Sequence, residues 1–436
     1  MKSAGRNLLL WIYLFGGIGV LWGTGTELTH WNKMRDFRAV YSASRCLLHH
    51  RDAYNFDTLH AEYLAEGGTE PKTARDLRVL HEGMLRCVNL PTALFLIIPL
   101  AALPWWLAHL IWAVLIVASS LLAAFWVASE SALYADRPTF ILISIWLIGL
   151  GDVMLVGNLA GMVVSLSVLG AWLLLNEKYP WFAVACLATA LLLKPHDAGF
   201  VWLFFLISPG PFRKRALQAL ALVAVAAASS VIWIYLTAPG WARELSANLH
   251  RLSGPGGFND PGGHDASLIA SLQAAVSAYK NDPHFYNPVS WIVSGGLLVL
   301  LLIKIARTSF TRRSAWMALA SLAALSILPV YHRFYDARIL LLSLPACALV
   351  WRDRRWKWTA LVLTIFGMVT TADLSHVVLV GALGEMRAQL LLKQLAPLSL
   401  LALGVFYLCA YWRETEQGEG SAHQRLVCEE TQAAGV

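Results

Sequence analysis

The chain has 436 residues, of which 58% are hydrophobic and only 14% are charged, whereas a soluble domain carries about 25% charged residues. Its net charge of +7 comes from short clusters of Lys and Arg between apolar stretches, and such clusters mark the cytoplasmic ends of membrane spans. These features exclude a soluble domain and argue against nucleic acid as a partner. They predict an all-α polytopic membrane protein.

The apolar stretches are long enough for membrane-spanning helices, which need about 20 residues each. The stretches without Asp, Glu, Lys or Arg lie between residues 86 and 130, 152 and 177, 215 and 243, 282 and 304, 313 and 333, 357 and 373, and 393 and 413. Before them, a basic start and an apolar run over residues 8–21 resemble a signal peptide without a good cleavage site. We therefore expect an uncleaved signal-anchor with a cytoplasmic N-terminus.

The charge pattern predicts one transmembrane domain over residues 1–412, in the inner (plasma) membrane and with two large extracytoplasmic loops. The loops cover residues 24–88 and 238–288, and residues 413–436 form a disordered cytoplasmic tail. Residues 138–153 are apolar, but counting them as a span would place the later basic clusters outside, so we predict a re-entrant or interfacial segment. In the first loop, Cys46 and Cys87 could form a disulfide if that loop is extracytoplasmic.

The first loop opens with an aspartate among arginines and aromatic residues, in "WNKMRDFRAVY". Five residues that follow recur at steps of three and four, which predicts an amphipathic helix along the membrane surface; they are Phe37, Val40, Tyr41, Ser44 and Leu48. Asp36 lies at the N-terminal end of this helix. From the residues alone it is either a helix cap or a catalytic base.

Several segments, in this order, resemble glycosyltransferase family 87. The first loop reads D-F-x-x-x-Y-x-A-x-R, then a leucine pair, then "AYNFD"; later come "NLPTALFLIIPLAALPWWLAHLIW", "LLLKPHDAGFVWLFFLISPGPFRKRAL" and "YHRFYDARILLLSLPA". Two features depart from the family pattern. "VGNLAG" stands where Gly-Gln and a nearby Asn are usual, and "HHRD" replaces a glycine after the leucine pair.

The resemblance implies a GT-C fold with about twelve transmembrane helices. It also implies transfer of a hexose, with mannose favoured, from a polyprenyl-phosphate donor to an extracytoplasmic hydroxyl of a lipid or glycan acceptor, with inversion. Such a transfer needs a carboxylate to accept the hydroxyl proton and cations to stabilise the departing phosphate. Asp36 is the expected base, and Lys194 and Arg45 are the expected phosphate ligands. Their alternative roles are an interfacial lysine and an ordinary arginine of an interfacial helix.

Further polar residues are expected near the substrate. His332 and Asp336 are four residues apart and within reach of each other on a helix; they could act in catalysis and binding, or form a structural cluster. Tyr41, Asn158 and His264 are expected to contact substrate, although the glycine-rich setting of His264 is equally typical of a turn. We find no convincing metal-ligand spacing and no nucleotide-binding loop, and so expect neither metal nor cofactor.

Two other classes of protein remain open. A transporter or lipid flippase would place its ionisable residues within spans, near the middle of the membrane. A non-catalytic membrane scaffold would tolerate substitutions on the outer face. The gathering of polar residues at one face favours the enzyme.

Overall fold

The computed structural model describes residues 2–29, 34–308 and 311–434, and these form helices and turns with no named strand. The α-helices are α1 (Lys2–Thr29), α2 (Arg35–Leu48), α3 (Phe56–Ala65), α4 (Ala74–Arg78), α5 (Pro91–Ala101), α6 (Trp105–Ala132), α7 (Asp136–Ile148), α8 (Leu150–Val156), α9 (Ala160–Leu175), α10 (Pro180–Leu193), α11 (Pro195–Ile207), α12 (Pro211–Thr237), α13 (Trp241–Ser253), α14 (Leu272–Tyr279), α15 (Pro283–Ser290), α16 (Gly296–Arg307), α17 (Arg312–Leu325), α18 (Ser343–Arg352), α19 (Lys357–Thr370), α20 (Asp373–Leu383) and α21 (Glu385–Ala434). Two π-helical segments, η1 (Val79–Met84) and η3 (Trp291–Gly295), and two 3₁₀ segments, η2 (His264–Leu268) and η4 (Phe334–Leu342), complete the described elements.

Many of these helices are suited to a bilayer. Within the described residues, seven segments are long and apolar enough to cross a membrane: Asn7–Gly25, Trp105–Ala132, Asp136–Val156, Pro211–Thr237, Pro283–Arg307, Phe334–Arg352 and Glu385–Glu416. α19 and most of α20 form an eighth if the pair, bent by 78°, is one span. Shorter apolar helices are α5, α9, α10 and α11. The predicted class, an all-α polytopic membrane protein, is confirmed, and the number of about twelve spans stays a prediction.

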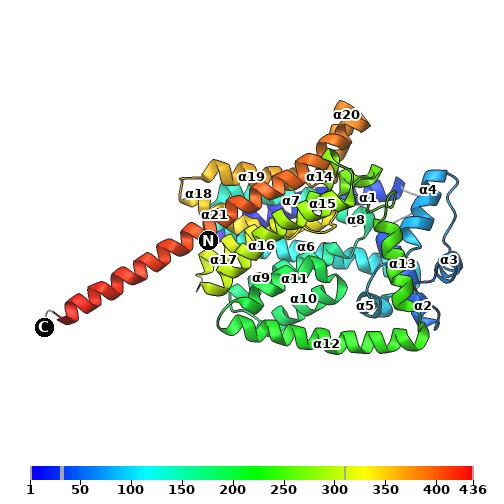
Figure 1. Ribbon diagram of the computed structural model, residues 1–436, viewed down its shortest axis with the longest axis horizontal. Helices are drawn as coiled ribbons and strands as arrows, with labels where there is room; N and C mark the ends of the chain where they lie inside the picture. The colour runs from blue at the N-terminus through cyan, green and yellow to red at the C-terminus, as the bar shows by residue number, and fades with distance from the viewer. Residues whose placement is uncertain (1, 30–33, 309–310, 435–436) are drawn as a thin grey trace.

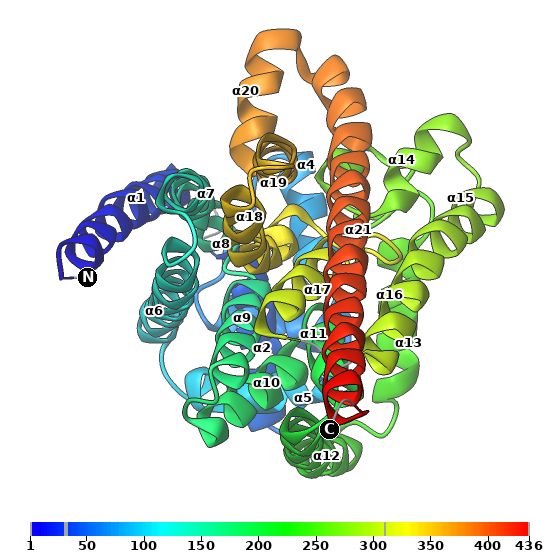
Figure 2. The same cartoon turned by 90° about the vertical axis from the view of Figure 1, so that its left-hand side faces the viewer.

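The loop helices gather at one end of the molecule. In Figure 1, α2, α3, α4 and α13 lie at the right, whereas α17, α18 and the C-terminal part of α21 lie at the left. We call the right-hand side the loop end. Figure 2 shows α1, α6 and α7 on one side and α14, α15 and α16 on the other, with α21 between them. The long apolar helices thus connect the loop end with the opposite end.

The segment that the sequence predicts to be re-entrant or interfacial, residues 138–153, is helical, and its course through the membrane stays a prediction. α7 and α8 together form a stretch, Asp136–Val156, that is long and apolar enough to span, and α1 packs along both helices. The charge that ends the apolar run, Asp152, is buried and ion-paired with Arg338 of η4 at 3.0 Å. Because the carboxylate is paired inside the protein, a charge at this position is no obstacle to a buried helix.

The two large loops are helical and contact each other. The predicted amphipathic helix is confirmed as α2, whose Phe37, Val40, Tyr41 and Ser44 are buried. Asn248 of α13 donates hydrogen bonds to the backbone oxygens of Tyr54 and Cys87 at 3.0 and 3.1 Å. Cys46 and Cys87 are buried free thiols, without the disulfide that remained open from the sequence.

The last helix continues into the tail. α21 continues to Ala434, where the sequence predicts a disordered tail from residue 413 onwards. Residues 413–436 include five Glu, three Gln and three Ala, which favour helix.

Candidate active site

A cavity of about 390 Å³ lies at the loop end. It is enclosed by α2 and η1 from the first loop, by the glycine-rich stretch after α13, and by the turns before α9, α11 and η4. Three residues that the sequence predicts at the site, Asp36, Asn158 and Lys194, line it together. The fold therefore brings candidates from distant parts of the chain to one cavity.

Asp36 lies in the first turn of α2 and directs its carboxylate to another element. Asn158 Nδ2 donates to Asp36 Oδ2 at 2.7 Å, and Arg35 Nε lies 3.5 Å from Oδ1. Met34, not Asp36, occupies the N-cap position. The side chain is 28% exposed. Asp36 is thus a partly accessible carboxylate with one oxygen held and the other only loosely paired.

The turn between α8 and α9 positions Asn158. Gly157 has a left-handed backbone with φ of 62°, which costs glycine little. Its carbonyl oxygen accepts from Trp112 Nε1 at 2.9 Å, and a Cβ on Gly157 would lie 2.6 Å from the Met34 Cβ. Asn158 Oδ1 in turn accepts from the Ala160 N–H at 2.9 Å. These contacts fix the Asn158 amide so that its nitrogen points at Asp36.

Lys194 lies between α10 and α11, where Pro195 begins the new helix. Its ammonium is 2.9 Å from Asp197 Oδ2 and makes a close ion pair with Asp336 Oδ1. Burial disfavours the ammonium, but the two carboxylates outweigh it and raise the pKa of Lys194. The lysine is therefore in the cavity wall, with its charge already balanced by two buried acids.

His332 belongs to this cluster rather than to the cavity lining. Its Nδ1 lies 3.1 Å from the backbone oxygens of Ile327 and Val330, and its Nε2 lies 3.5 Å from Asp197 Oδ1. Burial lowers the pKa of His332, but the nearby Asp197 carboxylate outweighs this and raises the pKa. His332 and Asp336, which the sequence places four residues apart, are thus connected through Lys194 and Asp197.

Three arginines that the sequence analysis did not select also line the cavity: Arg35, Arg86 and Arg333. Arg333 donates from its guanidinium to the Tyr331 hydroxyl and, at 3.1 Å, to the Phe258 backbone oxygen. Within the described residues, no carboxylate forms an ion pair with Arg333 or Arg86. The position of Arg333 in "YHRFYDAR" is a signal that could have drawn attention to it.

Arg45 and Tyr41 do not line the cavity, although the sequence predicts contacts with substrate. Arg45 is held by Glu66 at 2.6 Å and by Glu62 at 3.2 Å. The Tyr41 hydroxyl donates to the Leu103 backbone oxygen at 2.8 Å, and its pKa is raised to about 12 by burial and by Glu66. Both side chains already pair with acidic or carbonyl groups of neighbouring segments. They therefore connect α2 to its neighbours.

The side chain of His264 lies outside the described residues, and only its backbone, in η2, is placed.

A metal ion beside the cavity is poorly supported. His196, Asp197 and His332 bring three possible ligand atoms within 4.8 Å of one another. However, the Lys194 ammonium lies 2.9 Å from Asp197, so a dication there would meet a fixed positive charge. Lys194 itself serves as the cation of this cluster.

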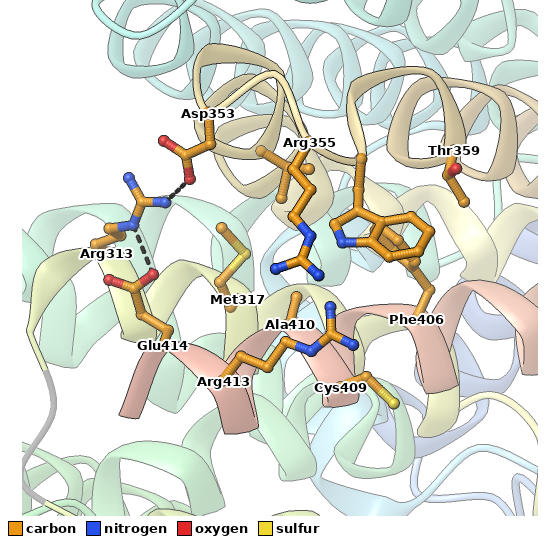
Figure 3. Close-up of a pocket in the computed structure, with 12 residues that line it drawn as sticks. Arg313, Met317, Asp353, Arg355, Thr359, Phe406, Cys409, Ala410, Arg413 and Glu414 are labelled. Carbon is orange, nitrogen blue, oxygen red and sulfur yellow. Dashed lines mark hydrogen bonds and ion pairs between the residues drawn. The ribbon is translucent and has the colours of Figure 1, made fainter. Parts of the chain in front are cut away.

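A larger cavity, of about 690 Å³, lies at the opposite end between α17, α18, α19 and α21 (Figure 3). Its carboxylates, Asp353 and Glu414, are both ion-paired with Arg313. None of the predicted site residues whose side chains are described lines it. We therefore place the candidate active site at the loop end, despite the smaller volume.

Comparison with known proteins identifies the family. Residues 88–331 match Glycosyltransferase family 87, which is more than half of the 436 residues. No curated protein and no solved structure matches the chain. The matched range includes Asn158 and Lys194 and ends directly before His332. The chain belongs to glycosyltransferase family 87, and it is a membrane glycosyltransferase.

Proposed function

We propose that this enzyme transfers a hexose, with mannose favoured, from a polyprenyl-phosphate donor to a hydroxyl of a lipid or glycan acceptor, with inversion. The observation that carries the proposal is the cavity at the loop end, where Asp36, Asn158 and three arginines line one space. A lipid-linked donor suits this location because its isoprenoid chain can remain in the bilayer while the phosphate and sugar reach the loops.

In this proposal Asp36 is the general base. Asn158 holds Asp36 Oδ2 at 2.7 Å, which leaves Oδ1 to take the acceptor proton as the hydroxyl attacks the anomeric carbon. A carboxylate placed in this way contributes about 10²–10⁴ to a rate. Since one carboxylate suffices for a single displacement, the arrangement supports inversion.

The departing phosphate needs positive charge. Arg333 and Arg86 are the best placed residues, because their guanidinium groups line the cavity without an ion-paired carboxylate among the described residues. Lys194 remains a candidate phosphate ligand, but a phosphate would compete there with Asp197 and Asp336. His332 and Asp336 then act by positioning Lys194.

The acceptor would enter from a neighbouring cavity of about 470 Å³, between η1 and the glycine-rich stretch after α13. Both cavities are lined by Arg86, Leu252 and Phe258, so they adjoin. Donor and acceptor can therefore approach Asp36 from two sides.

The test is Asp36→Asn. The amide still accepts a hydrogen bond from Asn158 but cannot take the acceptor proton, so we expect transfer from a labelled polyprenyl-phosphate sugar to fall by about a hundredfold or more. The thermal midpoint and donor binding should change little. All three quantities are measured on the same detergent-purified preparation.

Asp57→Asn is the matched control, because Asp57 is an exposed carboxylate in the first turn of α3, away from the cavity lining. It should transfer at the wild-type rate. An Asp36→Asn variant with undiminished transfer would refute the assignment of the base. Wild-type protein that leaves polyprenyl-phosphate sugars unused but turns over another activated sugar would refute the donor class.

A further inference from the structure

A second polar cluster lies in the first loop, outside the candidate active site. It consists of His60 on α3, Glu70 in the connection that follows, and His81 on η1. One ligand-type atom from each residue lies within 4.8 Å of the other two. Three separate segments of the loop thus direct nitrogen and oxygen atoms at one point, which the sequence spacing did not suggest.

The distances within this cluster are close to those between ligands of one metal ion. Glu70 Oε1 is 3.0 Å from His60 Nε2 and 3.5 Å from His81 Nε2. In a tetrahedral zinc site with bonds of about 2.0–2.2 Å, neighbouring ligand atoms lie about 3.3–3.6 Å apart. Only small movements would therefore complete the ligand triangle.

Hydrogen bonding alone does not account for the two imidazoles. The Nε2 atoms of His60 and His81 are shielded from solvent, and neither makes an aligned hydrogen bond with a described atom. By contrast, His49 Nδ1 makes a hydrogen bond to Glu62 at 3.1 Å. Buried polar atoms are nearly always satisfied, and an ion bound between these two nitrogens and the Glu70 carboxylate would satisfy all three groups.

The surroundings suit a metal ion. The ring of Phe56 packs against both imidazoles, with centroids 5.7 and 5.5 Å away, and so restricts their orientation. The Glu70 side chain is 49% exposed, which leaves room for water as a fourth ligand. Two imidazoles and one carboxylate are a common donor set for zinc.

We propose that His60, Glu70 and His81 bind a divalent transition-metal ion, for which Zn²⁺ is the best match. The ion would connect α3 with η1. Since Val79, Gly83 and Met84 of η1 line the candidate active-site cavity, metal binding would stabilise one wall of that cavity. The metal site is separate from the cavity that contains Asp36. Its test is therefore independent of the proposed sugar donor.

The experiment measures metal content and thermal stability of the full chain, purified in detergent with an affinity tag that contains no histidine. We expect about one zinc per chain by elemental mass spectrometry. Removal of the ion with a chelator should lower the thermal midpoint, and added Zn²⁺ should restore it. His81→Ala and the milder Glu70→Gln should both lose the ion and the response to Zn²⁺.

His284→Ala serves as the matched control, because His284 is an exposed histidine of α15 outside both clusters. It should keep the zinc. The proposal is overturned if wild-type protein contains no stoichiometric metal and the chelated protein does not respond to Zn²⁺. It is equally overturned if Glu70→Gln keeps the ion, or if His196→Ala loses the ion while His81→Ala retains it. Should His81→Ala fail to fold, Glu70→Gln decides the matter alone.

Discussion

Lys194 illustrates how the environment of a single residue changes the expected effect of its replacement. If Lys194 were only a phosphate ligand, its replacement would reduce donor use with little effect on folding. In the structure, however, its removal takes the lysine cation away from Asp197 and Asp336, whose side chains are each only 2% exposed. Leaving buried charges without a partner costs about 3–5 kcal/mol.

We therefore expect Lys194→Ala to lower the thermal midpoint clearly, together with transfer, and Lys194→Arg to retain part of both. The double variant Lys194→Ala/Asp336→Asn, which removes one stranded charge, should recover part of the lost stability. Thermal unfolding and donor turnover are measured in parallel. A Lys194→Ala protein with an unchanged midpoint would show that the ion cluster has no structural role.

At the scale of elements, the turn between α8 and α9 determines the position of Asn158, which is the hydrogen-bond partner of Asp36. Gly157→Ala places a side chain at φ of 62° and a Cβ 2.6 Å from the Met34 Cβ. Left-handed backbone with a side chain costs about 1–3 kcal/mol. Because Asn158 follows directly, we expect both the thermal midpoint and the transfer rate to fall.

Gly381→Ala is the control for this turn, since Gly381 lies in α20 with nothing within 4 Å of an added Cβ. It should be neutral or slightly stabilising, because alanine favours helix. If Gly157→Ala behaved like Gly381→Ala in both measurements, the turn would not be what positions Asn158.

For the whole molecule, the main prediction is which side of the membrane each of the two ends faces. α12 (Pro211–Thr237) has 27 residues, which at 1.5 Å per residue is about 40 Å and enough to cross a bilayer. It begins with basic residues and leads to the second loop. Basic loops favour the cytoplasm. A single cysteine that replaces Arg213 or Arg352 should therefore react with a membrane-impermeant thiol reagent only after permeabilisation. A cysteine that replaces Asp260 should react in intact cells.

Labelling after detergent solubilisation controls for buried cysteines, since all three positions should then react. If the cysteines at positions 213 and 260 reacted from the same side of the membrane, the predicted topology would be contradicted. It would also require the loop end, and with it the candidate active site, to be assigned to a different compartment.

Sequence patterns were sufficient where the determining forces are local or depend on composition. Apolar stretches without charge indicated the membrane helices, and steps of three and four residues indicated α2, because a helix exposes one face to each environment. Short motifs drew attention to Asp36, Asn158 and Lys194, all of which line one cavity. The same reasoning did not reveal the partners of Arg45 and Tyr41, because Glu66 and Leu103 belong to other parts of the chain.

What the sequence by itself determined is therefore the class of protein, an all-α membrane enzyme of glycosyltransferase family 87, and several residues of its candidate site. Only the tertiary structure decided which polar groups are partners. Asn158 meets Asp36 across 122 residues, and Lys194 meets Asp336 across 142. It also left Arg333 facing the cavity without an ion-paired carboxylate among the described residues, and brought His60, Glu70 and His81 together. The physical reason is that periodicity reports which environment a side chain faces, whereas charge pairing depends on distances that arise only when remote segments pack.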